Sequence, residues 1–154
     1  MPKKSLQETY APKAECFGCG PANDKGLRIR SFAEGEELVC EFTPEPHHLA
    51  FPGVLNGGIC GALLDCHSNW MAAYHLMKKS GVELLPCTVT AEFAVHLKRP
   101  TPLAEPLRLS AKVVESGSDR ATVEATITSE GKVTATCRGV FVVVKEGHPA
   151  FHRW

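Results

Sequence analysis

Residues 57–79 read GGICGALLDCHSNWMAAYHLMKK, and the rest of the predicted fold is arranged around this stretch. It contains no proline and no turn cluster, which predicts one long helix. Apolar residues recur in it at helical spacing, at Ile59, Ala62, Leu63, Cys66, Trp70, Ala73 and Tyr74. Asn56 is a suitable N-cap, the lysines at 78–79 complement the negative end of the helix dipole, and the Ser-Gly pair at 80–81 ends the helix. A helix with so few polar positions must be covered on more than one side, so we expect a sheet and a second subunit to wrap it.

The segments on both sides of this helix alternate apolar and polar residues, which is the period of β-strands. Before it, residues 27–32 and 38–42 predict a hairpin with a turn at 33–36. After it, four more strands are expected, at about 86–97, 106–116, 120–129 and 132–145. The last two are expected to form a hairpin that turns at Glu130-Gly131. An antiparallel sheet of about six strands that buries one long helix makes an α+β domain of two layers.

The length of 154 residues fits one domain with a sizeable core. We expect an N-terminal surface arm at 1–15, a single domain at 16–147 and a C-terminal tail at 148–154. Lys and Arg together number 17, as do Asp and Glu, so the net charge is zero. This balance argues against nucleic acid or an anionic membrane as a partner.

The seven cysteines are an odd number, and the polar start MPKKSLQETYAPK is not a secretory signal. We therefore expect reduced thiols in a cytoplasmic protein. No apolar run approaches the roughly 18 residues that a membrane span requires. Cys16 and Cys19 have the spacing of a metal-binding knuckle, but no second pair completes four ligands. We therefore expect Cys16 and Cys19 to form a structural turn, and we expect no bound metal or cofactor.

Asp65 is the most unusual residue of the predicted helix, because nearly all of its neighbours are apolar. A buried carboxylate is costly unless it is paired, and no Lys or Arg lies three or four positions away. Three interpretations follow from the residues alone. Asp65 lies on an exposed stripe of the helix, or it bonds to Ser68 or Asn69, or it is a functional group.

The helix start, Asn56-Gly57-Gly58, is a second candidate site. Two glycines let a ligand approach the free N–H groups of the first turn, where the helix dipole favours negative charge. That environment suits a carbonyl oxygen that develops negative charge during a reaction. The alternative is an ordinary tight turn with Asn56 as its cap.

The string HHLAFPGVLNGGICGALLDC at 47–66 resembles the hotdog-fold acyl-CoA thioesterases. It is most similar to the branch of the phenylacetate-pathway and 4-hydroxybenzoyl-CoA thioesterases and their mammalian relatives, whose pattern is close to H-x-G-x-P-G-x-x-H-G-G-x-x-x-x-x-x-D/E. The matching residues are His48, Pro52, Gly53, Gly57, Gly58 and Asp65. The start CFGCG at 16–20 and the strand at 88–93 also fit, so the resemblance covers nearly the whole chain from residue 16.

This resemblance implies a hotdog fold, in which the sheet wraps the central helix, and hydrolysis of an acyl-CoA. Asp65 would act as nucleophile or general base, the N–H of Gly57 would polarise the thioester carbonyl, and Thr90 would position water or Asp65 itself. The family usually has His before the two glycines, whereas this chain has Asn56. An amide forms hydrogen bonds but carries no charge near neutral pH. The residues expected on the substrate side are His48, Gly58 and Arg99.

Two other functions stay open at this stage. An acyl dehydratase or hydratase needs a His coupled to the acidic helix residue, and His48 is the one candidate. A non-catalytic acyl-CoA-binding module, as in hotdog-fold transcriptional regulators, is the other. The roughly 25 residues before the first strand are too few for a helix-turn-helix.

The spacing of Gly57 and Asp65 predicts an oligomer. Eight helical residues separate their Cα atoms by about 12 Å. Both groups must come within about 3–3.5 Å of the same reacting carbonyl. We therefore expect a homodimer, or a dimer of dimers (a homotetramer), in which Gly57 of one subunit faces Asp65 of the other across a twofold.

Overall fold

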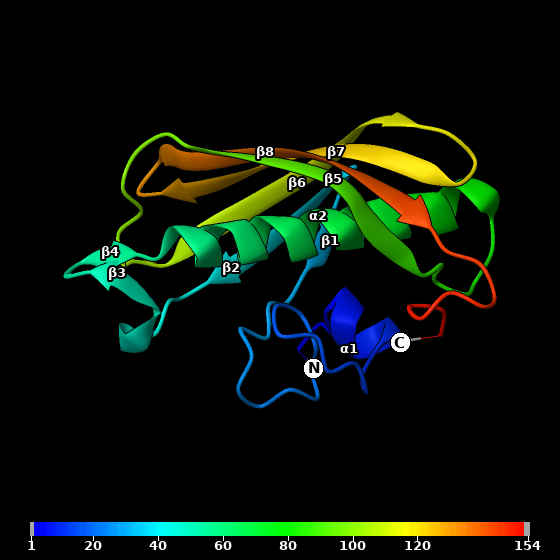
Figure 1. Cartoon of the computed structure of the whole chain (residues 1–154), viewed down its shortest axis with the longest axis horizontal. Helices are drawn as coiled ribbons and strands as arrows, with labels where there is room; N and C mark the ends of the chain where they lie inside the picture. Colours follow the sequence, from blue (N-terminus) through cyan, green and yellow to red (C-terminus); the bar gives the residue numbers. More distant parts are fainter. Residues whose placement is uncertain (1, 153–154) are drawn as a thin grey trace.

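Six antiparallel strands form one sheet in the order β1-β2-β6-β7-β8-β5, and one long helix, α2, lies across a face of this sheet (Figure 1). The structure is a computed structural model, which describes residues 2–152. The strands of the sheet are β1 (Phe32–Glu34), β2 (Glu37–Phe42), β5 (Thr88–Leu97), β6 (Leu107–Ser116), β7 (Arg120–Ser129) and β8 (Lys132–Val143). The predicted α+β hotdog architecture, a six-stranded sheet around a central helix, is confirmed.

Helix α2 (Gly57–Ser80) begins and ends where the sequence predicts. The side-chain oxygen of Asn56 accepts a hydrogen bond from the N–H of Ile59 at 3.2 Å, which caps the first turn. Gly81 follows the last turn with a left-handed φ of 72°, a conformation that favours glycine. Nearly half of the helix residues are buried, and Trp70 is only 1 % exposed. Within residues 2–152, no helix combines the length and apolar character needed to cross a membrane.

Strands β6, β7 and β8 form the centre of the sheet, and their inward residues pack against α2. Residues on that inner face of β6 and β7 are Leu107, Leu109, Ala111, Ala121, Val123, Ala125 and Ile127, all at most 2 % exposed. The predicted β7–β8 hairpin is confirmed, and it turns at Glu130 and Gly131 with left-handed φ values of 49° and 77°. Strand β5 lies at one edge of the sheet, where it pairs with β8.

The strand predicted at 27–32 is wrong over most of its length, because β1 has only three residues. Arg28 has a left-handed φ of 53°, which interrupts an extended chain. The N–H groups of Leu27 and Ile29 donate to carbonyl oxygens of the loop at 17–18, at 2.7 and 3.1 Å. The two apolar residues are buried. Their alternation with polar residues therefore reflects packing beneath a loop, and not pairing in the sheet.

Short elements also lie in the segment 43–53, for which the sequence predicts only a proline-punctuated loop. The segment contains the 3-10 helix η1 (Pro46–His48) and the strand β3 (Leu49–Phe51). Strand β3 pairs with β4 (Val54–Leu55) to form a small separate hairpin. This hairpin leads directly into Asn56 and the start of α2.

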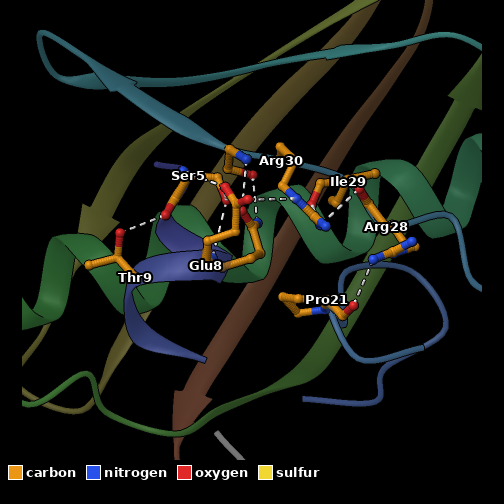
Figure 2. Close-up of polar contacts among 9 residues, drawn as sticks. Ser5, Glu8, Thr9, Pro21, Arg28, Ile29 and Arg30 are labelled. Atoms are coloured by element: carbon orange, nitrogen blue, oxygen red, sulfur yellow. Dashed lines mark hydrogen bonds and ion pairs between the residues drawn. The ribbon is translucent and has the colours of Figure 1, made fainter. Parts of the chain in front are cut away.

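The N-terminal segment packs on the side of α2 that faces away from the sheet (Figure 1). It contains helix α1 (Leu6–Tyr10), an element that was not predicted within the surface arm at 1–15. Ser5 and Glu8 form a capping box at the start of α1. Figure 2 shows Glu8 between Ser5 and Arg30, whose guanidinium lies 3.9 Å from the Glu8 carboxylate.

A chain of buried hydrogen bonds fastens this segment to α2. The amide of Gln7 donates to the hydroxyl of Ser31 at 2.9 Å, and that hydroxyl donates to Nδ1 of His67 at 2.9 Å. Nε2 of His67 donates to the carbonyl of Leu38 at 2.8 Å, which fixes the tautomer. Complete burial lowers the pKa of His67 to about 4, so its ring is neutral at pH 7. The polar residues of the N-terminal segment are therefore part of the folded structure.

Candidate active site

Asp65 lies half-buried in the middle of α2, and its carboxylate meets strand β5. The hydroxyl of Thr90 donates to Oδ1 of Asp65 at 2.7 Å. The helix residues Ser68 and Asn69, which were the alternative partners, form their hydrogen bonds elsewhere. Burial raises the pKa of Asp65 above its ordinary value, the Thr90 hydrogen bond opposes this rise, and negative charge at Cys16 adds to it. A more basic carboxylate is a better proton acceptor.

Strand β5 follows α2 from Asp65 back to the start of the helix. A Cβ atom at Gly61 would lie 4.0 Å from the ring of Phe93, and one at Gly57 would lie 3.0 Å from Leu97. The contact at Gly61 would be ordinary van der Waals contact, whereas the one at Gly57 would be tight, so Leu97 lies directly against the start of the helix. Phe93 is 39 % exposed and Leu97 is 57 % exposed. The strip between Asp65 and the helix start is thus an open apolar surface.

The first turn of α2 offers N–H groups that no helical carbonyl can reach. Asn56 uses its side-chain oxygen for the N–H of Ile59. The N–H groups of Gly57 and Gly58, which precede Ile59, have no carbonyl of the helix to donate to. A Cβ atom at Gly58 would lie 2.9 Å from the Asn56 side-chain oxygen, so the cap leaves little space for any other residue. The Asn56 cap therefore depends on the absence of a side chain at Gly58.

A depression of about 400 Å³ opens beside Gly57. Its lining is mostly apolar and includes Phe51, Val54, Leu55, Cys60, Leu97 and Pro100. Lys98 and Arg99 also line it, so the structure brings the predicted substrate-side residue Arg99 together with Gly57. An apolar pocket with a small number of polar groups is typical of a small-molecule site.

His48 does not line this depression, and its side chain is only 6 % exposed. Its Nδ1 accepts a hydrogen bond from the N–H of Glu45 at 3.0 Å, and its ring stacks on Phe42. The carbonyl oxygen of His48 accepts from the N–H of Asn56 at 2.9 Å. The observed contacts thus make His48 a residue that positions the helix start, while direct contact with a substrate stays a prediction.

The predicted site residues therefore fall into two groups within one chain. Asp65 and Thr90 form one group, joined by a hydrogen bond. Gly57 and Arg99 form the other, on the wall of the depression, and Asp65 is not part of that wall. Along the helix, the two groups are separated by about 12 Å of rise. That rise is several times the reach of about 3–3.5 Å within which each group must approach a reacting carbonyl.

Sequence reasoning missed a second polar pair between α2 and β5. The hydroxyl of Thr88 donates to the side-chain oxygen of Asn69 at 2.7 Å, and the Asn69 amide donates to the Thr88 carbonyl at 3.3 Å. Asn69 lies one helical turn after Asp65, on the same face of α2. The only signal in the sequence was this four-residue spacing of two Asx residues, which does not identify a partner on a strand.

Sequence reasoning also missed the third member of a cysteine cluster. Cys66, next to Asp65, has its sulfur 3.7 Å from that of Cys16, and the sulfurs of Cys16, Cys19 and Cys66 all lie within 4.8 Å of one another. Hydrogen bonds from Cys19 and Cys66 lower the pKa of Cys16, while the bonds to Cys16 raise the pKa of Cys66. Cys16 is also one of the groups that raise the pKa of Asp65.

Residues 52–136, more than half of the chain, match the family model described as the thioesterase superfamily. A thioesterase superfamily protein from Shewanella loihica PV-4 is similar over 91 % of this chain and 100 % of that one, with 26 % identity and a TM-score of 0.71. A phenylacetic acid degradation-related protein from Ralstonia eutropha JMP134 shares the fold, with 22 % identity over 82 % of this chain and 92 % of that one and a TM-score of 0.66. Zebrafish thioesterase superfamily member 2 also shares the fold, with 21 % identity over 80 % of this chain and 90 % of that one and a TM-score of 0.64. No curated protein matches the chain significantly.

Proposed function

The chain belongs to the thioesterase superfamily, and we propose that it hydrolyses an acyl-CoA thioester to the free acid and coenzyme A. Membership of the superfamily supports thioester hydrolysis in general. The observation that carries the finer proposal is a half-buried carboxylate on the central helix, Asp65, with Thr90 donating to it at 2.7 Å. All seven cysteines are free thiols, which supports a cytoplasmic location.

In this proposal, Asp65 starts the reaction. Thr90 holds Oδ1, which leaves Oδ2 to take a proton from water or to attack the thioester carbonyl directly. In the first route, hydroxide adds to the carbonyl, the C–S bond breaks and the coenzyme A thiolate takes up the proton. In the second route, an acyl-Asp65 anhydride forms as the thiolate leaves, and water then hydrolyses the anhydride. The products are the same, and both routes stay open.

A second subunit completes each site in this proposal. The outer side of edge strand β5 can pair with the same strand of a second copy about a twofold axis. Antiparallel pairing centred near the middle of β5 brings Thr90 opposite the stretch from Val95 to Leu97 of the partner subunit. Leu97 packs against Gly57 of its own chain. This geometry supports an approach of the Asp65 carboxylate to the Gly57 N–H of the partner subunit, which would stabilise the oxyanion.

The depression beside Gly57 supports coenzyme A as the thiol part of the substrate. Lys98 and Arg99 line it, and cationic side chains bind phosphates well. The apolar walls suit the pantetheine arm, whose thioester end would reach the Gly57 N–H. This proposal assigns phosphate binding to Lys98 and Arg99 and carbonyl polarisation to Gly57.

Two observations favour hydrolysis over the other functions considered from the sequence. A hydratase needs a His coupled to Asp65, but the His48 ring is bonded to Glu45 and stacked on Phe42. A purely binding module has no need of a carboxylate with a raised pKa and an open oxygen beside the substrate strip. Asn56 in place of the family His is compatible with hydrolysis, because it serves as the helix cap.

The experiment is a thiol-release assay with Ellman's reagent and a panel of aromatic, short aliphatic and long aliphatic acyl-CoA thioesters. The best acyl group is then tested as its N-acetylcysteamine thioester, which lacks the phosphates. Removing both cations with Lys98→Ala and Arg99→Ala should raise KM about tenfold for the CoA ester, about 1.4 kcal/mol, and leave the short ester unaffected. Lys112→Ala, an exposed lysine on β6, is the matched control. Absence of turnover with every acyl-CoA would refute hydrolysis, and an unchanged KM in the double variant would refute the phosphate site alone.

A further inference from the structure

Three cysteine sulfurs meet where the N-terminal segment crosses α2. Cys16 and Cys19 belong to one loop, and Cys66 belongs to the helix. The Cys16 and Cys66 sulfurs are 3.7 Å apart, and all three lie within 4.8 Å of one another. The prediction of no metal rested on the absence of further ligands for Cys16 and Cys19. The structure supplies one from a position 47 residues further along the chain than Cys19.

The loop is shaped to bring its two sulfurs onto Cys66. A Cβ atom at Gly18 would lie 2.4 Å from the Cys66 sulfur, so only glycine allows this approach. A Cβ atom at Gly20 would lie 2.4 Å from the backbone nitrogen of Cys16, so the turn itself needs a second glycine. The N–H of Gly20 donates to the Cys16 carbonyl at 2.8 Å and closes the turn.

The three cysteines differ in their access to solvent. Cys16 is exposed, whereas Cys19 is buried and Cys66 is partly buried. An ion can therefore reach the cluster from solvent through Cys16. Simple core packing of three thiols does not explain this exposure.

The spacing of the sulfurs fits a tetrahedral ion. Three sulfurs at about 2.3 Å from one tetrahedral centre lie roughly 3.8 Å from each other. The Cys16–Cys66 separation of 3.7 Å is close to that value, and the Cys19 sulfur lies within 4.8 Å of both. Three soft thiolate ligands select zinc or a similar soft ion over magnesium or calcium. A water molecule or a small thiol completes four ligands.

We propose that Cys16, Cys19 and Cys66 bind one zinc ion, which fastens the N-terminal segment to the central helix beside Asp65. Binding releases up to three protons, because each thiol coordinates as a thiolate. The ion links the loop at 16–20 to a residue next to the carboxylate, and so holds that loop in place over this part of α2. No redox step is involved.

Cobalt(II) is the probe for this site, because thiolate–cobalt charge-transfer absorption reports sulfur ligands without any need for turnover. The full-length, untagged protein is reduced, stripped with a chelator and titrated with Co²⁺ in the absence of oxygen. We expect the absorption to saturate at one Co²⁺ per chain and to disappear when Zn²⁺ is added. Metal analysis of protein purified without added metal should find about one zinc per chain.

Two variants and one control test whether the Co²⁺ ion binds at the three cysteines. Cys16→Ser, at an exposed position, and Cys66→Ser should each weaken Co²⁺ binding at least about a hundredfold. Loss of a residue that only hydrogen-bonds to a metal ligand already lowers metal affinity by up to about that factor, and loss of a ligand should cost no less. Cys40→Ala, at a buried cysteine outside the cluster, should bind as the parent does. Circular dichroism checks that each variant is folded, and Cys16→Ser alone suffices if Cys66→Ser does not fold. No thiolate–cobalt absorption in the fully reduced protein would overturn the proposal. Co²⁺ binding that survives Cys16→Ser would also overturn the proposal, because it would mean an adventitious ion only.

Discussion

Two polar pairs join the same helix to the same strand, and they differ in what surrounds them. The inner pair is Asn69 with Thr88, and the outer pair is Asp65 with Thr90. In both, a threonine hydroxyl donates to a side-chain oxygen at 2.7 Å. Thr88 is fully buried, whereas Thr90 is exposed. One turn of helix thus separates a closed pair from an open one.

The inner pair satisfies its own groups, because the Asn69 amide also donates to the Thr88 carbonyl. The outer pair has a carboxylate that accepts one hydrogen bond from Thr90 and can accept several more. A neutral, reciprocal pair stabilises the contact between helix and strand, while an open carboxylate with a raised pKa can act on a substrate. The two pairs share the threonine contact, so charge and exposure are what distinguish the structural inner pair from the outer pair with its proposed catalytic role.

The largest effect is expected when the outer pair is made like the inner one. Asp65→Asn replaces the carboxylate by the amide that position 69 already has, and it should lower kcat at least about a hundredfold, because the general base or nucleophile is lost. KM and the fold should change much less. The measurement is steady-state thiol release with the best acyl-CoA, together with circular dichroism. Near-normal turnover in this variant would remove Asp65 from the proposed mechanism.

A smaller effect, on stability, is expected when the inner pair is broken. Thr88→Val leaves the Asn69 oxygen without its 2.7 Å donor, which should cost about 1–3 kcal/mol of the free energy of unfolding. The kcat of the folded protein should stay close to parental, since the outer pair is intact. Urea unfolding and thiol release measure the two quantities. A large loss of kcat without loss of stability would show that the two pairs do not divide their roles in this way.

The smallest effect is expected when the hydroxyl of the outer pair is removed. Thr90→Val should reduce kcat about tenfold, since one positioning hydrogen bond contributes about 1.5 kcal/mol. The free energy of unfolding should change by no more than about 0.5 kcal/mol, because Thr90 is exposed. Thr90→Ser keeps the hydroxyl and is the matched control, with activity close to the parent. If Ser and Val variants have equal activity, the hydroxyl has no positioning role.

Local signals explain what could be predicted from the sequence. The ends of α2 follow from Asn56 as a cap and Gly81 in a left-handed conformation, and both act within a few residues. The β7–β8 hairpin likewise follows from its own turn. Asp65 was prominent because its helix offered no cation to pair with it.

Contacts between distant segments explain what could not be predicted. Leu27 and Ile29 alternate with polar residues, yet their backbone pairs with a loop, because burial alone does not reveal which element covers a residue. Cys66 joins Cys16 across 50 positions of sequence, and no spacing rule connects them. The division of Gly57 and Asp65 into two groups could be anticipated, since helical rise follows from residue count alone.

In the proposed mechanism, each site combines Asp65 of one subunit with Gly57 of another, and a mixed dimer separates this arrangement from a site within one chain. Asp65→Asn removes the carboxylate. Gly57→Pro removes the N–H at the first helical position, where proline suits the helix backbone, and Asn56 already has the φ of −58° and ψ of 131° that precede proline. A Cβ atom at position 57 would lie 3.0 Å from the end of the exposed Leu97 side chain, which has room to turn away.

Each variant alone should be nearly inactive. Heterodimers of the two, co-expressed with different tags and shown to be folded and dimeric, carry one site with both lesions and one intact site. With shared sites, these heterodimers should recover up to about half of parental activity, as two-site symmetry implies. Activity that stays at the level of the two inactive homodimers would contradict the shared site.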